Sequence, residues 1–416
     1  MKENMPEFLK LTPPDRARSL LLENVSIPNL ESFEINVIDA LECVIARDIK
    51  AIHPLPTFNR SSVDGYAVIA KDTFGASESM PGYLKLMGEV QMGKAPTFEL
   101  IPGQGAIIHT GGMLPQNATA VIMLEHVQEI NGKEIEIQRS VAENENVIWV
   151  GEDVAHNQIV IHKGTKLRPA DIGGLMALGI QKIHIYKKPK IGIISSGDEI
   201  VAPDQKIEPG QVRDINSYSL GSLIVQNGGE PIFYGIVPDQ FDQLEKTAEK
   251  ALNECDALII TAGSSASVRD MTAEVINSLG KPGVIVHGIS IRPGKPTIIG
   301  IINGKAVIGL PGNPVSAMVN GYLMVVPLLE KISGNLFPKP RSFVKAKLTV
   351  NISSQAGRED WQTVKLVKQG NELLAVPIFG KSNLIFSLAS ADGLIKIESN
   401  ANGVNSGDFV DVFVIR

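Results

Sequence analysis

Residues 189–332 alternate between short apolar runs and amphipathic helical stretches, and this alternation restricts the possible folds most strongly. Residues 191–195 form the kind of run found in a strand buried on both faces. Residues 216–227 then place Leu220, Leu223 and Ile224 on one helical face. Strands and helices that alternate at this spacing predict a doubly wound parallel sheet, which we place at 187–334.

The rest of the chain divides into regions that differ in their predicted secondary structure. Residues 51–150 carry short β-rich runs between Gly and Pro, with a hairpin expected at 128–139, so we expect a small β domain. Residues 335–416 are again strand-rich and form a second one. Residues 1–50 read as helical and amphipathic, whereas 151–186 are mixed, with a helix expected from about Pro169 to Leu178 and ended by Gly179. The predicted fold class is multidomain α/β plus β.

Length and composition exclude several classes of function. A chain of 416 residues is long enough for two to four domains. Its net charge of −6 argues against a nucleic-acid-binding surface or a polybasic membrane patch. The two cysteines, Cys43 and Cys255, give no disulfide framework and no CxxC site. With no signal peptide and no membrane-spanning run recognisable, we expect a cytoplasmic location.

Three loops follow strands of the α/β region, where an open parallel sheet binds its ligands. Small residues in them let the backbone approach a ligand, and N–H groups at a following helix suit a phosphate. None is a Walker A or GxGxxG sequence, which disfavours an ATPase or a dinucleotide-binding enzyme. The loops are 195–199, 261–267 and 309–314.

Charged residues gather near these loops. Arg292 and Lys295 lie three residues apart in a Pro-Gly turn and are candidates for an oxyanion clamp. Glu199, Asp239 and Asp270 could share a magnesium ion with substrate phosphates. Alternatively, Asp239 and Asp270 are only helix N-caps, a common position for Asp. The seven histidines show no metal-ligand spacing, so we expect all of them to be structural.

Short motifs recur in a fixed order from about residue 30 to the C-terminus. They are PTFNRSSVDGYAV at 56–68, HTGGMLP at 109–115, GED at 151–153, SGDE at 196–199, GQVRDINS at 210–217, RPGKP at 292–296, GLPGNPVS at 309–316 and Gly357-Arg358 with Asp360. In this order they resemble the motifs of the molybdopterin molybdotransferases, the family of MoeA and the C-terminal domain of gephyrin. The central domain would then be of the molybdopterin-binding type.

The resemblance implies an elongated homodimer with four domains per chain, the first of which combines residues 1–50 and 151–186. It also implies a reaction in which molybdate, or tungstate, is inserted into adenylylated molybdopterin with Mg²⁺-dependent release of AMP. Handover from the adenylyltransferase, and to recipient molybdoenzymes, would follow from that role.

The family roles are carried over only to matching positions. Asp64 and Thr110 would be catalytic residues that line the cleft from the β domain and face the other subunit. Alternatively, Asp64 forms an Asx-turn with Gly65. Glu199, Asp239 and Asp270 would bind the metal and, with Lys295, act in catalysis. The expected substrate and oxyanion contacts are Ser196, Gly197, Ser265, Arg292, Pro311, Asn313, Ser316, Arg358 and Ser382. Pro311 could also be purely architectural.

The sequence departs from the family pattern at three places. The glycine-rich loop reads TAGSSAS at 261–267, so two glycines have gained side chains. Residues 148–150 are Ile-Trp-Val where many members carry arginine. Arg292 replaces a lysine, which keeps the charge and changes the geometry. These departures leave the choice between molybdate and tungstate open.

Two other functions remain possible at this stage. The first is molybdopterin adenylyltransferase, because that enzyme has a similar α/β domain. The second is a non-catalytic molybdopterin-binding or scaffold protein, since a fold does not fix function. The retained acidic and basic residues favour the molybdotransferase.

Overall fold

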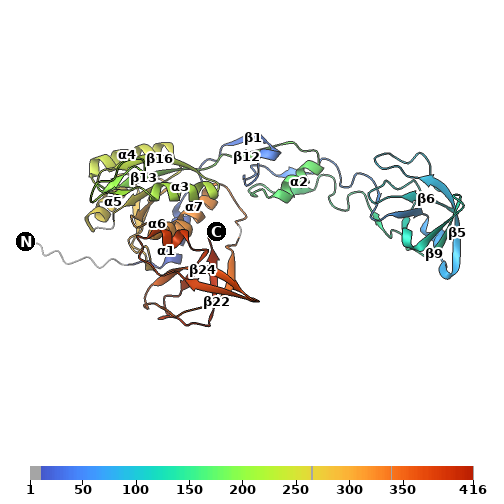
Figure 1. The fold of residues 1–416 in the computed structure, drawn as a ribbon. Helices are drawn as coiled ribbons and strands as arrows, with labels where there is room; N and C mark the ends of the chain where they lie inside the picture. The colour runs from blue at the N-terminus through green and yellow to red at the C-terminus, as the bar shows by residue number, and fades with distance from the viewer. Residues whose placement is uncertain (1–10, 264–265, 339, 416) are drawn as a thin grey trace, which may run out of the picture.

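The computed structural model describes residues 11–263, 266–338 and 340–415. The molecule is elongated, with the α/β domain and the C-terminal β domain side by side at one end and the other β domain at the far end (Figure 1). Between them lies a narrow linker region that contains β1, β12 and α2. The predicted multidomain α/β plus β class is confirmed.

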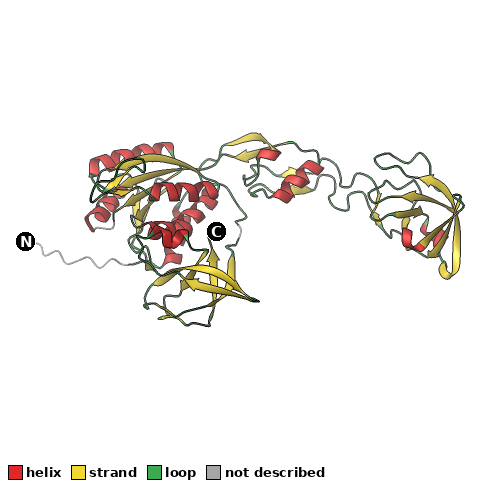
Figure 2. Cartoon of the chain, viewed as in Figure 1, coloured by secondary structure: helices red, strands yellow, loops and turns green. Residues whose placement is uncertain are grey.

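A six-stranded sheet forms the centre of the α/β domain, in the order β16-β13-β17-β21-β20-β18. Helices cover both of its faces (Figure 2). One face packs on α3, α6 and α7, and the other on α4 and α5, so the sheet is doubly wound as predicted. The strands are β13 (Lys190–Ser196), β16 (Glu230–Val237), β17 (Ala257–Ala262), β18 (Pro282–His287), β20 (Ile298–Ile302) and β21 (Lys305–Pro311). The helices are α3 (Asn216–Gln226), α4 (Phe241–Glu254), α5 (Ala266–Ser278), α6 (Pro314–Asn320) and α7 (Val326–Ile332).

One strand runs against the predicted direction. β16, β13, β17 and β21 are parallel neighbours, whereas β20 is antiparallel to both β21 and β18. The connection from β20 to β21 is only Asn303 and Gly304, both with positive φ. A two-residue turn forms a hairpin and is too short for a parallel crossover. The sheet is therefore mixed at this edge.

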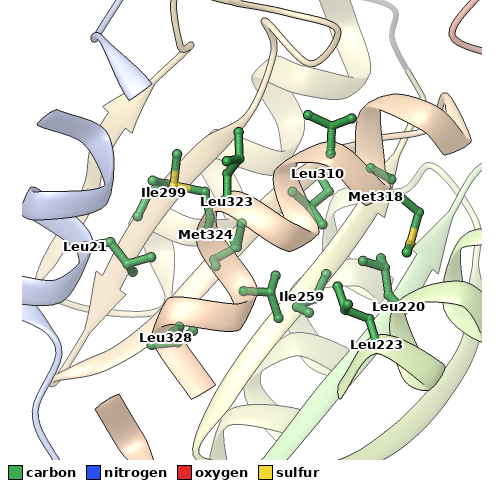
Figure 3. Close-up of a cluster of buried hydrophobic side chains, with 14 of the residues drawn as sticks. Leu21, Leu220, Leu223, Ile259, Ile299, Leu310, Met318, Leu323, Met324 and Leu328 are labelled. Atoms are coloured by element: carbon green, nitrogen blue, oxygen red, sulfur yellow. The ribbon is translucent and has the colours of Figure 1, made fainter. Parts of the chain in front are cut away.

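The first helix belongs to a different domain from the one expected. α1 (Pro14–Asn24) has its buried residues Ala17 and Leu21, with Val25 just beyond its end, in the core of the α/β domain. Figure 3 shows Leu21 facing the cluster that contains Ile299 and Leu328. Residues 1–50 are thus not one helical segment of the linker region. The apolar face of α1 was predicted correctly, but an apolar helix face does not specify which surface of the protein it packs against.

The last helical run of the domain is continuous from Pro314 to Ile332 and contains a π-helical turn at Gly321–Val325. It is long and apolar enough to span a membrane, yet 78% of that stretch is buried inside the protein. Its residues Leu323, Met324 and Leu328 lie in the core cluster. Here the run acts as a core helix.

The linker region brings together two distant chain segments by strand pairing. β1 (Ser32–Asn36) pairs with β12 (Lys182–Tyr186), and β2 (Ile49–Lys50) pairs with β11 (Ile159–Ile161). α2 (Pro169–Ala177) covers this pairing and ends at Gly179, whose φ of 71° only glycine adopts readily. The helix and its end agree with the prediction.

The far β domain is a six-stranded sheet in the order β7-β4-β6-β5-β9-β8. The hairpin expected at 128–139 is present, with Asn131 and Gly132 both at positive φ. The strands are β4 (Gly65–Val68), β5 (Ser77–Glu89), β6 (Gln104–Ile108), β7 (Ala120–Met123), β8 (Val127–Ile130) and β9 (Glu134–Arg139).

The C-terminal domain has a sheet in the order β19-β24-β25-β22-β28-β26. Its edge strand β19 comes from the α/β part of the chain and pairs in parallel with β24, Arg292 opposite Asp360. This pairing ties the two domains together. The elements are β19 (Ile291–Arg292), β22 (Phe343–Leu348), β24 (Glu359–Gln369), β25 (Glu372–Pro377), α8 (Ile385–Ala389), β26 (Gly393–Ile397) and β28 (Phe409–Val414).

Candidate active site

A cavity of about 1140 Å³ lies between the α/β domain and the C-terminal domain. It collects residues from the RPGKP turn, the start of α6, the start of β24 and the loop after β25. Seven residues proposed from the sequence line it together: Arg292, Lys295, Pro311, Asn313, Ser316, Arg358 and Ser382.

The RPGKP turn is held against the long core helix. Its Gly294 has a φ of 113°, and a Cβ there would come within 1.8 Å of the Asn320 side chain. The Thr297 hydroxyl donates to the Gly294 carbonyl (2.8 Å), and the Ile289 N–H donates to the Lys295 carbonyl (2.9 Å). Only glycine fits, and the two cations are carried on a fixed backbone.

Two buried carboxylates at the start of β24 lie beside this turn. Asp360 accepts a hydrogen bond from Arg358 Nε (2.9 Å), and its other oxygen is 3.6 Å from an Arg292 nitrogen. Glu359 is paired with Lys396 at 3.3 Å, and burial raises the pKa of its carboxyl while the ammonium opposes this. Asp360 therefore orients both arginines at the pocket wall.

The pocket is strongly positive although the protein is acidic. Its lining contains four cationic side chains, Arg292, Lys295, Arg358 and Lys381, against the single carboxylate of Asp360. That is a formal excess of three positive charges on a chain whose net charge is −6. The arrangement suits a dianionic ligand such as a tetrahedral oxyanion or a phosphate.

A second group of predicted residues meets where β13 and β16 end. Ser196 Oγ donates to Asp239 Oδ1 (2.7 Å), and the Asp239 N–H donates to Asp198 Oδ1 (3.2 Å). The N-cap of α4 is Gln240, so the alternative of Asp239 as a helix cap is wrong. Gly197 and Glu199 occupy the turn between β13 and β14 (Ile200–Val201) and are not among the residues that line the cavity.

The three predicted metal carboxylates do not form a ready-made site. Asp270 lies inside α5, exposed, rather than at its N-cap. Within the described ranges, no group of three His, Cys, Asp or Glu side chains is close enough to hold a metal ion. The chemistry of Asp239 and Glu199 still fits Mg²⁺, which is commonly bound by one or two carboxylates plus substrate phosphates. Ser265 lies outside the described residues.

A buried hydroxyl network, which is not among the site residues predicted from the sequence, supports these strand ends. Ser195 Oγ donates to Asp214 Oδ2 (2.9 Å) and contacts the hydroxyls of Ser217 (2.8 Å) and Thr261 (3.2 Å). All four side chains are buried. Asp214 and Ser217 belong to the GQVRDINS motif, so the motif was a signal, but only the fold shows that its polar residues point inward.

Asp64 and Thr110 lie together at the far end of the molecule. Asp64 Oδ1 accepts the Thr110 N–H (2.8 Å), a contact that joins two loops of the β domain. His109, which we expect to be structural, lies between two carboxylates: its Nε2 is 2.7 Å from Glu89 and its Nδ1 is 3.8 Å from Asp64. Figure 1 places this domain well away from the α/β and C-terminal domains of the same chain, between which the cationic pocket lies.

Three protein-family models together match most of the chain. Residues 12–179 match the family model "MoeA N-terminal region (domain I and II)", residues 192–331 match "Probable molybdopterin binding domain", and residues 345–415 match "MoeA C-terminal region (domain IV)". The chain is 38% identical to a molybdopterin biosynthesis protein of Methanocaldococcus jannaschii over 98% of both chains. It is 31% identical to the molybdopterin molybdenumtransferase of Haemophilus influenzae, over 96% of this chain and 97% of that one.

Solved structures agree with this. A MoeA protein from Pyrococcus horikoshii superposes with a TM-score of 0.84 at 33% identity, over 97% of this chain and 100% of that chain. A second structure from the same organism has a TM-score of 0.77 at 38% identity, over 98% and 100%. The chain belongs to the MoeA family of molybdopterin biosynthesis proteins.

Proposed function

We propose that this chain is a molybdopterin molybdenumtransferase, which inserts molybdate into adenylylated molybdopterin and releases AMP. The cationic pocket is the observation that supports this most directly, because molybdate and the substrate phosphates are all anionic. Arg292, Lys295 and Arg358 would hold the oxyanion, and the hydroxyls of Ser316 and Ser382 would donate hydrogen bonds to it.

The carboxylates would act in the Mg²⁺-dependent cleavage of the pyrophosphate link. Asp239 and Glu199, with Asp270 in α5, would hold Mg²⁺ against the pyrophosphate link. The metal supplies positive charge to the leaving phosphate oxygen. Ser196 keeps Asp239 oriented through its hydrogen bond of 2.7 Å. A site completed by substrate fits the absence of a three-carboxylate group within the part of the chain that the structure describes.

The site would be shared between two chains. Asp64 and Thr110 belong to the far β domain and do not line the pocket of their own chain. The linker region separates that domain from the α/β and C-terminal domains (Figure 1). A two-fold homodimer would bring the β domain of one subunit to the pocket of the other. We place this reaction in the cytoplasm, between an adenylyltransferase that supplies the pterin and the molybdoenzymes that receive the product.

Mixing two inactive variants tests the shared site. Asp64→Asn chains and Arg358→Ala chains, each inactive alone, should regain about a quarter of wild-type activity when refolded together, because half the dimers are mixed and each has one intact site. If each site were formed by a single chain, the mixture would regain no activity.

The reaction itself is tested by AMP release from adenylylated molybdopterin with magnesium and either molybdate or tungstate. Oxyanion-dependent AMP release, with a product that activates a cofactor-free molybdoenzyme, is the expected result. Pyrophosphate release from ATP and molybdopterin would instead identify an adenylyltransferase. Tight binding of substrate without AMP release would leave a binding protein.

A further inference from the structure

The loop from Ile378 to Leu384 joins β25 to α8 at the edge of the cationic pocket and is fixed at both ends. The Ile378 N–H donates to the Thr363 carbonyl (2.8 Å), and the Ile378 carbonyl accepts from the Thr363 hydroxyl (2.9 Å) and the Gln362 amide (2.6 Å). At the other end, the Ser382 carbonyl accepts the Val315 N–H of α6 (3.0 Å). The residues between these anchors are therefore held in place.

This segment presents an aromatic ring and an ammonium group to the pocket. Phe379 lines the cavity and is 63% exposed, although leaving an aromatic ring in water is unfavourable. Lys381, two residues further on, also lines the cavity and has no ion pair among the residues that the structure describes. An exposed ring is a surface on which flat heterocycles stack, and a nearby ammonium binds phosphate.

We propose that Phe379 and Lys381 form a subsite for a planar fused heterocycle that carries a phosphate, separate from the oxyanion contacts of Arg292 and Arg358. The proposal rests on the proposed function for the identity of the ligand. The substrate has two groups of this chemistry, a pterin with its phosphate and an adenylate. The anchoring of the loop holds the backbone that carries both side chains, which lowers the entropic cost of ordering this segment on binding.

Direct binding measurements separate this subsite from the reaction. The probes are AMP, an oxidised pterin bearing the same phosphate, and molybdate. In Phe379→Ala the affinity for one of the two ring ligands should fall about tenfold or more, as it does when stacking is removed from nucleotide-binding sites. Molybdate affinity should be unchanged. Phe379→Tyr keeps the ring and should bind like the wild type.

Matched controls are available in the same domain. Phe386 on α8 is 80% exposed and is not among the lining residues, so Phe386→Ala should leave both ring ligands unaffected. Lys381→Gln should weaken the phosphorylated ligand but not its dephosphorylated form, whereas Lys365→Gln, on the exposed side of β24, should change neither.

Loss of pterin binding alone would assign the subsite to the pterin, and loss of AMP binding alone would assign it to the adenylate. Unchanged affinity for both ring ligands in Phe379→Ala, or equal losses in Phe379→Ala and Phe379→Tyr, would overturn the proposal. Binding is measured without turnover, so the two proposals can fail separately. A wild-type protein that binds both ligands but releases no AMP would refute the proposed enzyme activity but not the proposed subsite.

Discussion

Leu21 gives a direct test of where the first helix belongs. Its side chain is fully buried in the core of the α/β domain, with Ile299 and Leu328 in the same cluster (Figure 3). Replacing a fully buried Leu with Ala typically costs about 2–5 kcal/mol, through lost transfer free energy and a residual cavity. α1 is an outer layer that can move inward, so we expect about 2–3 kcal/mol for Leu21→Ala.

That loss should appear in only one part of the molecule. Trp361 lies in the same core cluster as Leu21, whereas Trp149 packs in the far β domain. In a Trp149→Phe background, urea unfolding followed by fluorescence therefore reports on the α/β and C-terminal domains. With a slope of about 2 kcal/mol per molar urea, the midpoint should fall by about 1 M.

The substitution should also disturb the pocket. Just before α1, Thr12 exchanges backbone hydrogen bonds with Gly288 (3.1 Å) and Ser290 (2.9 Å), which precede the RPGKP turn. Loosening α1 should therefore raise the KM for molybdate. Ile38→Ala, at a site that is 72% exposed in the linker region, should change the stability by less than about 0.5 kcal/mol. A midpoint shift for Leu21→Ala no larger than that of Ile38→Ala would refute the docking of α1 on the α/β domain.

Three further predictions concern single side chains. Arg358→Lys keeps the charge but loses the planar guanidinium that pairs with Asp360. The KM for molybdate should therefore rise about tenfold with little change in kcat. An unchanged KM would show that the geometry of this side chain is unimportant. His109→Ala should slow AMP release because Asp64 and Glu89 lose the imidazole that lies between them. His109→Gln keeps a hydrogen-bond donor and should recover most of the rate. Equal rates of AMP release for the two variants would contradict this. Burial raises the pKa of the half-buried Glu330, so its ionised form destabilises the fold at high pH. Glu330→Gln should therefore raise the urea midpoint at pH 8, with the gain shrinking as the pH falls toward 4.5; a gain independent of pH would exclude titration of Glu330 as the cause.

Most of the local structure could be predicted from the amino-acid sequence. Strand and helix positions in the α/β domain follow from apolar periodicity, and the ends at Gly179 and at Asn131-Gly132 follow from turn chemistry, since both depend on residues close in the chain. The family resemblance also named seven residues that line the pocket, and the family roles carried over to the site residues stay predictions.

The contacts between surfaces that are distant in the chain could not be predicted in this way. The spacing of Ala17, Leu21 and Val25 predicts a buried stripe but not the sheet that covers it. Arg292 and Arg358 are 66 residues apart, and they converge because β19 joins the sheet of the C-terminal domain and both arginines then reach Asp360. The inward network of Asp214 and the contacts of His109 were missed for the same reason. A side chain's partners depend on long-range packing, which local periodicity does not encode.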